Sequence, residues 1–232
     1  LVIRLRARKD ADEIERISRA CELVEAALSE LFSSLRVGDR EWEVNARVES
    51  RMREQGAAAS HPLILFGENA ANPHGKPGGR ELRTGDVVCA DLSACLDGSW
   101  RDLTRCATVG LPGEWAREAW LVVREAQAAA IESARVGTPA NEIDLAQRRI
   151  VEAAPTLGEC LHGAGHAIGM AVHEPPFLVP RVAEPLAEGV VLTIEPGIYK
   201  RGVGGLRLED DVAVLAEGPR VLSTLPLELY EV

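Results

Sequence analysis

The 232-residue chain repeats itself, and this repeat constrains the fold more than any other feature of its sequence. Residues 36–38, Arg-Val-Gly, recur 99 positions later as residues 135–137. Because the repeated positions fall in segments with the same order of expected elements, we interpret the chain as two related halves. The same offset of 99 joins Ala27 to Ala126, Ser34 to Ser133, Glu43 to Glu142, Val44 to Ile143, Asn45 to Asp144 and His74 to His173.

Each half predicts two helices followed by strands. Residues 10–13, Asp-Ala-Asp-Glu, match a capping box, and apolar residues then recur at helical spacing over residues 14–35. Apolar positions within residues 44–52 mark one face of a second helix. In the second half, a helix is expected over residues 114–134, and another is expected to open at Thr138-Pro139, with the proline as its first helical residue.

Two short apolar strands carry carboxylates at matching places. Residues 85–91 and 189–195 each run from a glycine to an acid six residues later, at the expected end of the strand. A further acid follows each strand, after 11 residues in the first half and after 14 in the second. A pseudo-two-fold arrangement would bring all four together, although each acid alone also fits an ordinary salt-bridged turn. The four carboxylates are Asp91, Asp102, Glu195 and Glu209.

A glycine-rich segment, residues 161–175, contains three of the five histidines, His162, His166 and His173. Its glycines allow close approach and tight turning of the backbone. If this segment is an alternating strand, His162 and His166 face the same side, because they are four residues apart. A lone histidine is usually a satisfied polar residue, but three within 12 positions indicate a functional site.

Four carboxylates and one imidazole predict a site for two divalent metal ions. Two neighbouring cations repel each other, so such a pair needs several anionic oxygens, and some of these have to bridge. The oxygen-rich ligand set favours a hard ion such as Mn over a zinc ion held by thiolates. A site of this kind polarises a carbonyl group and turns a bound water into a nucleophile at neutral pH.

Composition excludes several other classes of function. A formal net charge of −10 argues against nucleic acid or an anionic membrane as the main partner. No stretch reaches the roughly 18 consecutive apolar residues of a membrane span. Five cysteines without a CxxC pair are typical of buried thiols in a reducing cytoplasm. The first residues lack an initiating Met and the pattern of a signal peptide, so we expect a trimmed domain of a cytoplasmic protein.

The combined motifs resemble the pita-bread metallopeptidases, in the branch of the Xaa-Pro dipeptidases (prolidases) and Xaa-Pro aminopeptidases. The resemblance implies an α+β fold, in which a curved antiparallel sheet is backed by helices from both halves. It also implies one catalytic domain over residues 1–232, without the N-terminal domain that helps full-length relatives to form homodimers. The matching stretches cover nearly all of the chain and are residues 72–74, 91–105, 162–175, 193–199 and 205–210.

The resemblance implies hydrolysis of the Xaa-Pro bond in dipeptides or short peptides by a hydroxide that bridges two divalent metals. Asp91 would bind one metal, and His166 and Glu195 would bind the other. Asp102 and Glu209 would bridge the two ions, which would be Mn, with Co, Zn or Fe as alternatives. Glu195 would also accept a proton from the attacking water.

By the same resemblance, four further residues meet the peptide substrate. His173 would stabilise the developing oxyanion or hold the proline side of the substrate in position. His74 and His162 would line the pocket, and Arg207 would hold a carboxylate, either of a metal ligand or of the substrate. For Arg207 a plain surface role stays open. His61 matches no position of the site and is interpreted as structural.

Four positions depart from the usual pattern of this branch, namely Ser93, Trp100, Arg101 and Ala167. They remove no ligand, but they put the range of substrates in doubt. The choice between dipeptides and longer peptides stays open as well.

Three alternatives share the fold. A methionine aminopeptidase has similar ligands, but Arg207 and the ending at residues 227–232 favour the proline-directed branch. A hydrolase of the creatinase type works without metal, and a non-catalytic module would bind peptides or histones. The five retained ligands argue against both.

Overall fold

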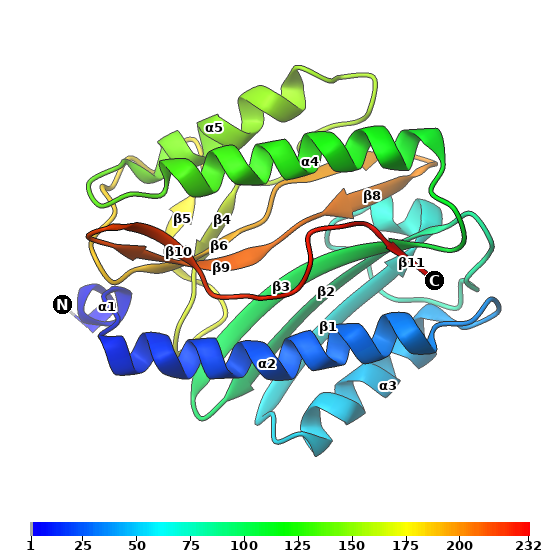
Figure 1. Cartoon of the computed structure of the whole chain (residues 1–232), viewed down its shortest axis with the longest axis horizontal. Coiled ribbons are helices and arrows are strands. Elements are labelled where there is room, and N and C mark those ends of the chain that lie inside the picture. Colours follow the sequence, from blue (N-terminus) through cyan, green and yellow to red (C-terminus); the bar gives the residue numbers. More distant parts are fainter. Residues whose placement is uncertain (1) are drawn as a thin grey trace.

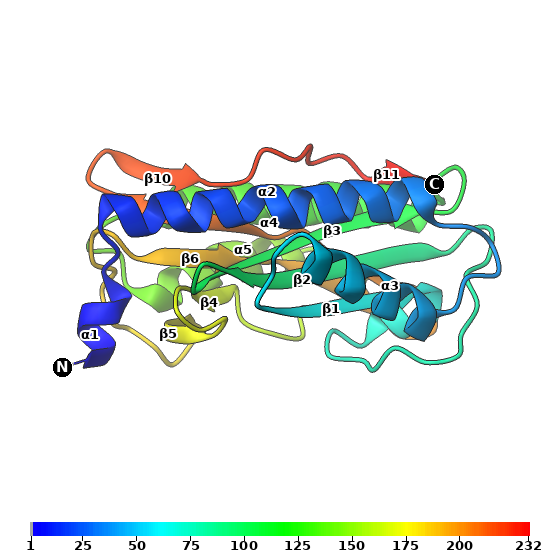
Figure 2. The ribbon, with the colours of Figure 1, turned by 90° about the horizontal axis from the view of Figure 1, so that it is seen from below.

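The computed structural model describes residues 2–232, so Leu1, which the expected single domain includes, lies outside the described part. Figure 1 shows two long helices, α2 (Ala11–Ser34) and α4 (Glu114–Ser133), that run along the long axis with strands between them. Figure 2 shows both helices in one layer, with most of the strands on one side of it. Within residues 2–232, no helix combines the length and the apolar character that crossing a membrane requires.

In the first half, α2 and a further helix, α3, pack against a sheet in which β1, β2 and β3 pair antiparallel. A short C-terminal strand, β11 (Tyr230–Glu231), joins the free edge of this sheet in parallel. The elements of this half are α1 (Val2–Ala7), α2, α3 (Glu41–Glu54), β1 (Ala59–Phe66), the 3-10 turn η1 (Gly67–Ala71), β2 (Val87–Leu96) and β3 (Ser99–Thr108).

The second half forms a five-stranded sheet of order β10-β9-β6-β4-β5 and a separate pair, β7-β8, all antiparallel. The predicted α+β class is therefore confirmed, with its strands divided among three sheets. The elements of this half are α4, α5 (Ala140–Glu152), β4 (Gly165–Ala167), β5 (Glu174–Leu178), β6 (Val191–Ile194), β7 (Gly197–Lys200), β8 (Gly204–Arg207), β9 (Asp210–Leu215) and β10 (Gly218–Val221).

The repeat seen in the sequence recurs in the hydrogen bonds of the backbone. Gly38 and Gly137 both adopt a positive φ, of 95° and 86°, in the turn that leads to the second helix of each half. The Gly38 N–H donates to the Leu82 carbonyl at 2.9 Å, and the Gly137 N–H donates to the Leu186 carbonyl at 2.8 Å. The two halves therefore use the same turn and the same tie to the segment that precedes their central strands.

A polar side chain on the second helix of each half ties that helix to the backbone near the sheet. In the first half, the Asn45 amide donates to the carbonyl of Ile64 at 2.9 Å and accepts from its N–H at 3.0 Å. In the second half, Asp144 accepts a hydrogen bond from the N–H of Ala164 at 3.1 Å. The repeated pair Asn45 and Asp144 thus has a structural explanation, because each ties the second helix of its half to the backbone beside it.

The central hairpins of the two halves differ in one respect. Asp91 lies in the middle of β2, opposite Thr104 of β3, because β2 keeps its neighbours on both sides. The prediction that Asp91 ends a strand is therefore wrong. In the second half, Glu195-Pro196 separates β6 from β7 and Leu208-Glu209 separates β8 from β9. A proline has no N–H to donate to a sheet, which accounts for the first interruption.

The helix boundaries follow the predicted capping signals, with one difference. The Glu13 N–H donates to Asp10 Oδ1 at 2.8 Å, and the Asp10 N–H donates to Glu13 Oε2 at 3.0 Å, which confirms the capping box of α2. The start of α5, by contrast, lies one residue later than predicted. Pro139 is extended, with ψ at 136°, because it forms an isolated β-bridge with Pro185, and the helix begins at Ala140.

The two halves meet where β3 lies beside β9, and two buried ion pairs join them there. Arg105 Nη2 donates to Asp210 Oδ1 at 2.8 Å, and Arg101 Nη1 lies 3.1 Å from Asp211 Oδ2. Arg105 Nη1 also donates to the carbonyl of Glu209 at 2.7 Å. All four charged side chains are at most 1% exposed, so each charge depends on its partner.

Replacing Arg105 by methionine is expected to lower the free energy of unfolding by about 3–5 kcal/mol, because it leaves Asp210 charged, buried and without its cation. Chemical denaturation followed by circular dichroism measures this change. The matched control is Arg220→Met, at an exposed position on β10, which should shift stability by no more than about 0.5 kcal/mol. Equal effects of the two substitutions would show that the buried pair does not support the junction.

Candidate metal centre

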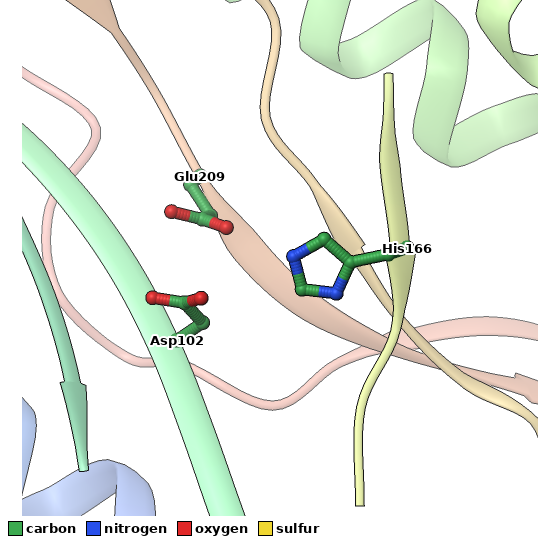
Figure 3. Close-up of side chains that lie close together, drawn as sticks. All are labelled: Asp102, His166 and Glu209. Atoms are coloured by element: carbon green, nitrogen blue, oxygen red, sulfur yellow. The ribbon is translucent and has the colours of Figure 1, made fainter. Parts of the chain in front are cut away.

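Three buried side chains from different segments of the chain converge where the two halves meet. Asp102 lies on β3, His166 lies on β4, and Glu209 lies between β8 and β9. One ligand atom of each lies within 4.8 Å of the ligand atoms of the other two. Figure 3 shows the two carboxylates facing each other, with the imidazole ring pointing toward them. We call Asp102, His166 and Glu209 the central group.

The charges of the central group fit a divalent cation. Burial raises the pKa of Asp102 and of Glu209 well above their usual range, and the charge of Glu209 raises the pKa of Asp102 further. Within the described residues, the buried Oδ1 of Asp102 has no hydrogen-bond partner. Two buried acids side by side and an unpartnered oxygen are unfavourable alone, but a cation between them would stabilise both.

His166 is arranged as a neutral ligand. Its Nδ1 lies 3.1 Å from the carbonyl of Ala167, so the proton belongs on Nδ1 and the lone pair of Nε2 is available to a metal. Burial, together with the nearby His173, lowers the pKa of His166 to about 4. The ring is therefore uncharged at neutral pH, as metal binding requires.

The other two predicted ligands, Asp91 and Glu195, flank the central group. Glu195 Oε1 lies 3.7 Å from His166 Nε2, and the carboxylate accepts from the Thr193 hydroxyl at 3.5 Å. Burial raises the pKa of Glu195 to about 7, against the lowering effect of Arg207. The charge of Asp91 contributes to the raised pKa values of Asp102, Glu195 and Glu209. The structure thus brings all five side chains into one region, and their role as ligands stays a prediction.

Arg207 connects several groups of the site. Its Nη2 donates to Asp91 Oδ2 at 2.5 Å, its Nε donates to the Thr104 hydroxyl at 3.1 Å, and its Nη1 donates to the Tyr199 hydroxyl at 2.9 Å. Of the two carboxylates considered for Arg207, the structure shows contact with that of a predicted ligand. Arg207 is buried, so the surface role is wrong.

Sequence reasoning missed two residues of this network, Thr104 and Tyr199. The Thr104 hydroxyl donates to Glu209 Oε2 at 2.6 Å, and so fixes the orientation of that carboxylate. The Tyr199 hydroxyl lies 2.7 Å from His162 Nε2. Thr104 is two residues after Asp102 on the same strand, so the alternation of side chains could have indicated that it faces the site.

His162 reaches the site by a different route from the one predicted. β4 covers only residues 165–167, so His162 is not on a strand with His166. It lies in an irregular segment because Gly165 has a φ of 147° and its backbone lies close to Thr193. The Nδ1 of His162 is 2.8 Å from the carbonyl of Gly163 and 3.9 Å from Glu195 Oε2, so both of its ring nitrogens have protein partners.

His173 and His74 lie at the exposed side of the site. The ring centroid of His173 is 4.3 Å from that of His166, and His173 itself is exposed. His74 is exposed in the loop after η1, where its N–H donates to Asn72 Oδ1 at 3.2 Å. Burial lowers the pKa of His173, the charge of Asp91 raises it, and the charge of His74 lowers it.

Comparison with known proteins agrees with this arrangement. The model of metallopeptidase family M24 matches residues 15–216. The Xaa-Pro dipeptidase of Pyrococcus furiosus is 37% identical over 227 residues, which are 97% of this chain and 65% of that protein. The solved X-Pro aminopeptidase of Thermotoga maritima MSB8 superposes with a TM-score of 0.96 at 35% identity, over 100% of this chain and 66% of that one. The Xaa-Pro dipeptidase of Bacillus anthracis gives a TM-score of 0.95 at 35% identity, again over 100% and 66% of the two chains.

The chain belongs to metallopeptidase family M24. Its α+β fold is that of the prolidases and aminopeptidases it superposes on, and this confirms the predicted pita-bread fold. The chain spans 65% of the length of the curated dipeptidase it matches.

Addition of Mn²⁺ to chelator-stripped protein is expected to raise the melting temperature, and to raise it more at about pH 7.5 than at about pH 5.5. With a pKa of about 7, Glu195 is mainly protonated at the lower pH and has to lose its proton to bind a metal. His166, with a pKa of about 4, is neutral at both values and does not compete. When the free ligand concentration is about 100 times the Kd, binding adds about 2.7 kcal/mol to the free energy of unfolding.

Without metal, the effect of rising pH on stability has the opposite sign. A carboxyl whose pKa is raised on folding holds more protons in the folded state than in the unfolded one, so Glu195 makes stability fall as pH rises toward about 7. Thermal unfolding at several pH values measures both effects. An equal response to Mn²⁺ at both pH values would contradict the assignment of Glu195 to the metal site.

The substitution Thr104→Val is expected to weaken Mn²⁺ binding by about 10- to 100-fold, the usual effect of removing a hydrogen bond that orients a ligand. Valine keeps the branched shape that suits a strand, but it loses the hydrogen bond to Glu209. Isothermal titration calorimetry measures the affinity. The control is Thr108→Val on the same strand, which loses only a hydrogen bond to the carbonyl of Gly110 and should bind as the wild type does.

Proposed function

We propose that the protein is a metal-dependent exopeptidase that hydrolyses the Xaa-Pro bond of dipeptides or short peptides. The observation that carries the proposal is the central group, Asp102, His166 and Glu209, whose ligand atoms lie within 4.8 Å of one another. Membership of family M24 and the identity of 37% with a protein named Xaa-Pro dipeptidase support the choice of reaction.

Five side chains would hold two divalent ions, Asp91, Asp102, His166, Glu195 and Glu209. Asp102 and Glu209 face each other and are the two candidates for bridging. Mn is the preferred ion over Co, Zn or Fe, because four of the five donors are carboxylates. Bound there, the two ions would polarise the carbonyl before the proline and supply a hydroxide nucleophile at neutral pH.

Glu195 is the candidate for moving the proton. Without metal its pKa is about 7, and nearby metal ions would lower it, so the carboxylate would be ionised and able to accept a proton. The Thr193 hydroxyl donates to its Oε1 at 3.5 Å, and the Nδ1 of the neutral His162 ring lies 3.9 Å from its Oε2. Glu195 would therefore take the proton of the attacking water and return it to the leaving amine.

The histidines and Arg207 divide the work of binding and positioning. His173 and His74 are exposed, so they are free to contact the peptide and to donate to the developing oxyanion. Both nitrogens of His162 have protein partners, so it would line the pocket with its ring. All three nitrogens of Arg207 donate within the protein, so its role is to position Asp91.

The proposal also covers the oligomeric state, the location and the partners of the enzyme. A homodimer of the full-length form follows from the resemblance to the family. The cytoplasmic location follows from the pattern of the cysteines, whose five thiols are all free. The partner is a peptide, not nucleic acid or a membrane, in agreement with a net charge of −10.

The test compares Ala-Pro, Ala-Pro-Ala and Met-Ala-Ser after chelator stripping and addition of Mn²⁺. Release of Ala from the proline peptides only when metal is added is the expected result, because the carboxylates alone supply no nucleophile. The ratio of the two proline peptides then separates a dipeptidase from an aminopeptidase. Liquid chromatography of the released amino acids measures the rates.

Two outcomes would contradict the proposal. Cleavage of Met-Ala-Ser alone would place the protein with the methionine aminopeptidases. Stoichiometric binding of Mn²⁺ without cleavage of any of the three peptides would favour a non-catalytic peptide-binding module.

A further inference from the structure

The register of the first sheet places His61 on the face that carries the predicted metal ligands. His61 of β1 lies opposite Ser93 of β2, and Ser93 lies opposite Asp102 of β3. Residues directly opposite each other in a sheet point to the same side, so His61 shares the side of Asp102. With strands about 4.8 Å apart, the backbones of these two residues are about 10 Å apart. The neighbouring row, Leu63 and Asp91, repeats this relation.

His61 is exposed and touches a second aromatic ring. The ring centroids of His61 and Trp100 are 5.1 Å apart, with an angle of 33° between the planes. Trp100 lies two residues before Asp102 on β3, on the same face as that ligand. The expectation that His61 is only structural does not account for an exposed ring beside the ligands.

Trp100 is fixed relative to the histidine segment. Its backbone N–H donates to the carbonyl of Gly169 at 2.7 Å, and Gly169 lies between His166 and His173 in the chain. His61 and Trp100 therefore lie beside the segment that carries His166 and His173.

The two ends of the site differ in how open they are. Arg207 and Tyr199 are buried at one end, where both are committed to hydrogen bonds within the protein. At the other end His61 is exposed and Trp100 is half-buried, so space and ring surface are available. A constant group such as the proline ring fits a closed end, whereas a variable side chain needs an open one.

We infer that His61 and Trp100 form the subsite for the side chain of the residue before the proline, and that this subsite favours an aromatic side chain. The inference rests on the proposed Xaa-Pro hydrolysis and names a class of substrates for it. Two adjacent aromatic rings attract a third through stacked or edge-to-face contact, beyond the effect of the buried area. Each such contact corresponds to about a 2- to 10-fold preference.

The test uses the Mn²⁺-loaded protein and measures kcat and KM for Phe-Pro and Ala-Pro. Wild type should prefer Phe-Pro, mainly through a lower KM. His61→Ala should reduce the ratio of kcat/KM for Phe-Pro over Ala-Pro by about 2- to 10-fold, because one ring is lost. His61→Phe should retain the preference, since it keeps a ring at the same place. A merely structural role would not separate these two variants.

Further variants complete the design. Trp100→Leu should reduce the ratio in the same way, and Trp100→Phe should restore most of it. The control is Leu121→Ala, because Leu121 is an exposed apolar side chain on α4, which lies far from β1 in Figure 1, and should not affect the ratio.

A failure of the subsite and a failure of the proposed function are distinguishable. Cleavage of both peptides with the same ratio in wild type, His61→Ala and Trp100→Leu would overturn the subsite and leave the proposed function intact. Failure of the wild type to cleave either peptide would overturn the proposed function, and with it the inference.

Discussion

Repulsion among buried carboxylates is the constraint on which the rest of the structure depends. Asp102 comes from the first half of the chain and Glu209 from the second, and they face each other in a buried position. The raised pKa of each expresses the cost of placing negative charges together away from water. A fold that brings them together has to hold its two halves against this repulsion, and a bound cation would reverse its sign.

The junction of the halves provides the opposing charges. Along β3, alternation of side chains puts Asp102 on one face and Arg101 and Arg105 on the other. The two arginines pair with Asp211 and Asp210, which directly follow Glu209 in the chain. The same two segments therefore carry the facing acids on one side and the ion pairs that join the halves on the other. The site and the junction are therefore parts of one arrangement.

Local patterns predicted the parts of the fold that local physics decides. The capping box of α2, the extent of α4 and the repeat around Gly38 and Gly137 depend on neighbouring residues, and the structure contains all of them. Predictions failed where a segment distant in the chain determines the local backbone conformation. Asp91 lies inside β2 because strands on both sides extend β2 past it. Pro139 is extended because it meets Pro185 across a bridge.

By itself, the sequence determined the two related halves, each with helices followed by strands, and the set of acids and histidines that the site brings together, while its resemblance to a known family implied the α+β class. Periodicity, caps and spacing are local properties, so they can be read along the chain. Only the tertiary structure decided that Arg207 donates to Asp91, that Thr104 donates to Glu209 and that His61 lies on the face of the predicted ligands. Each of these relations joins segments far apart in the chain, and strand register and the packing of the two halves determine which of them meet.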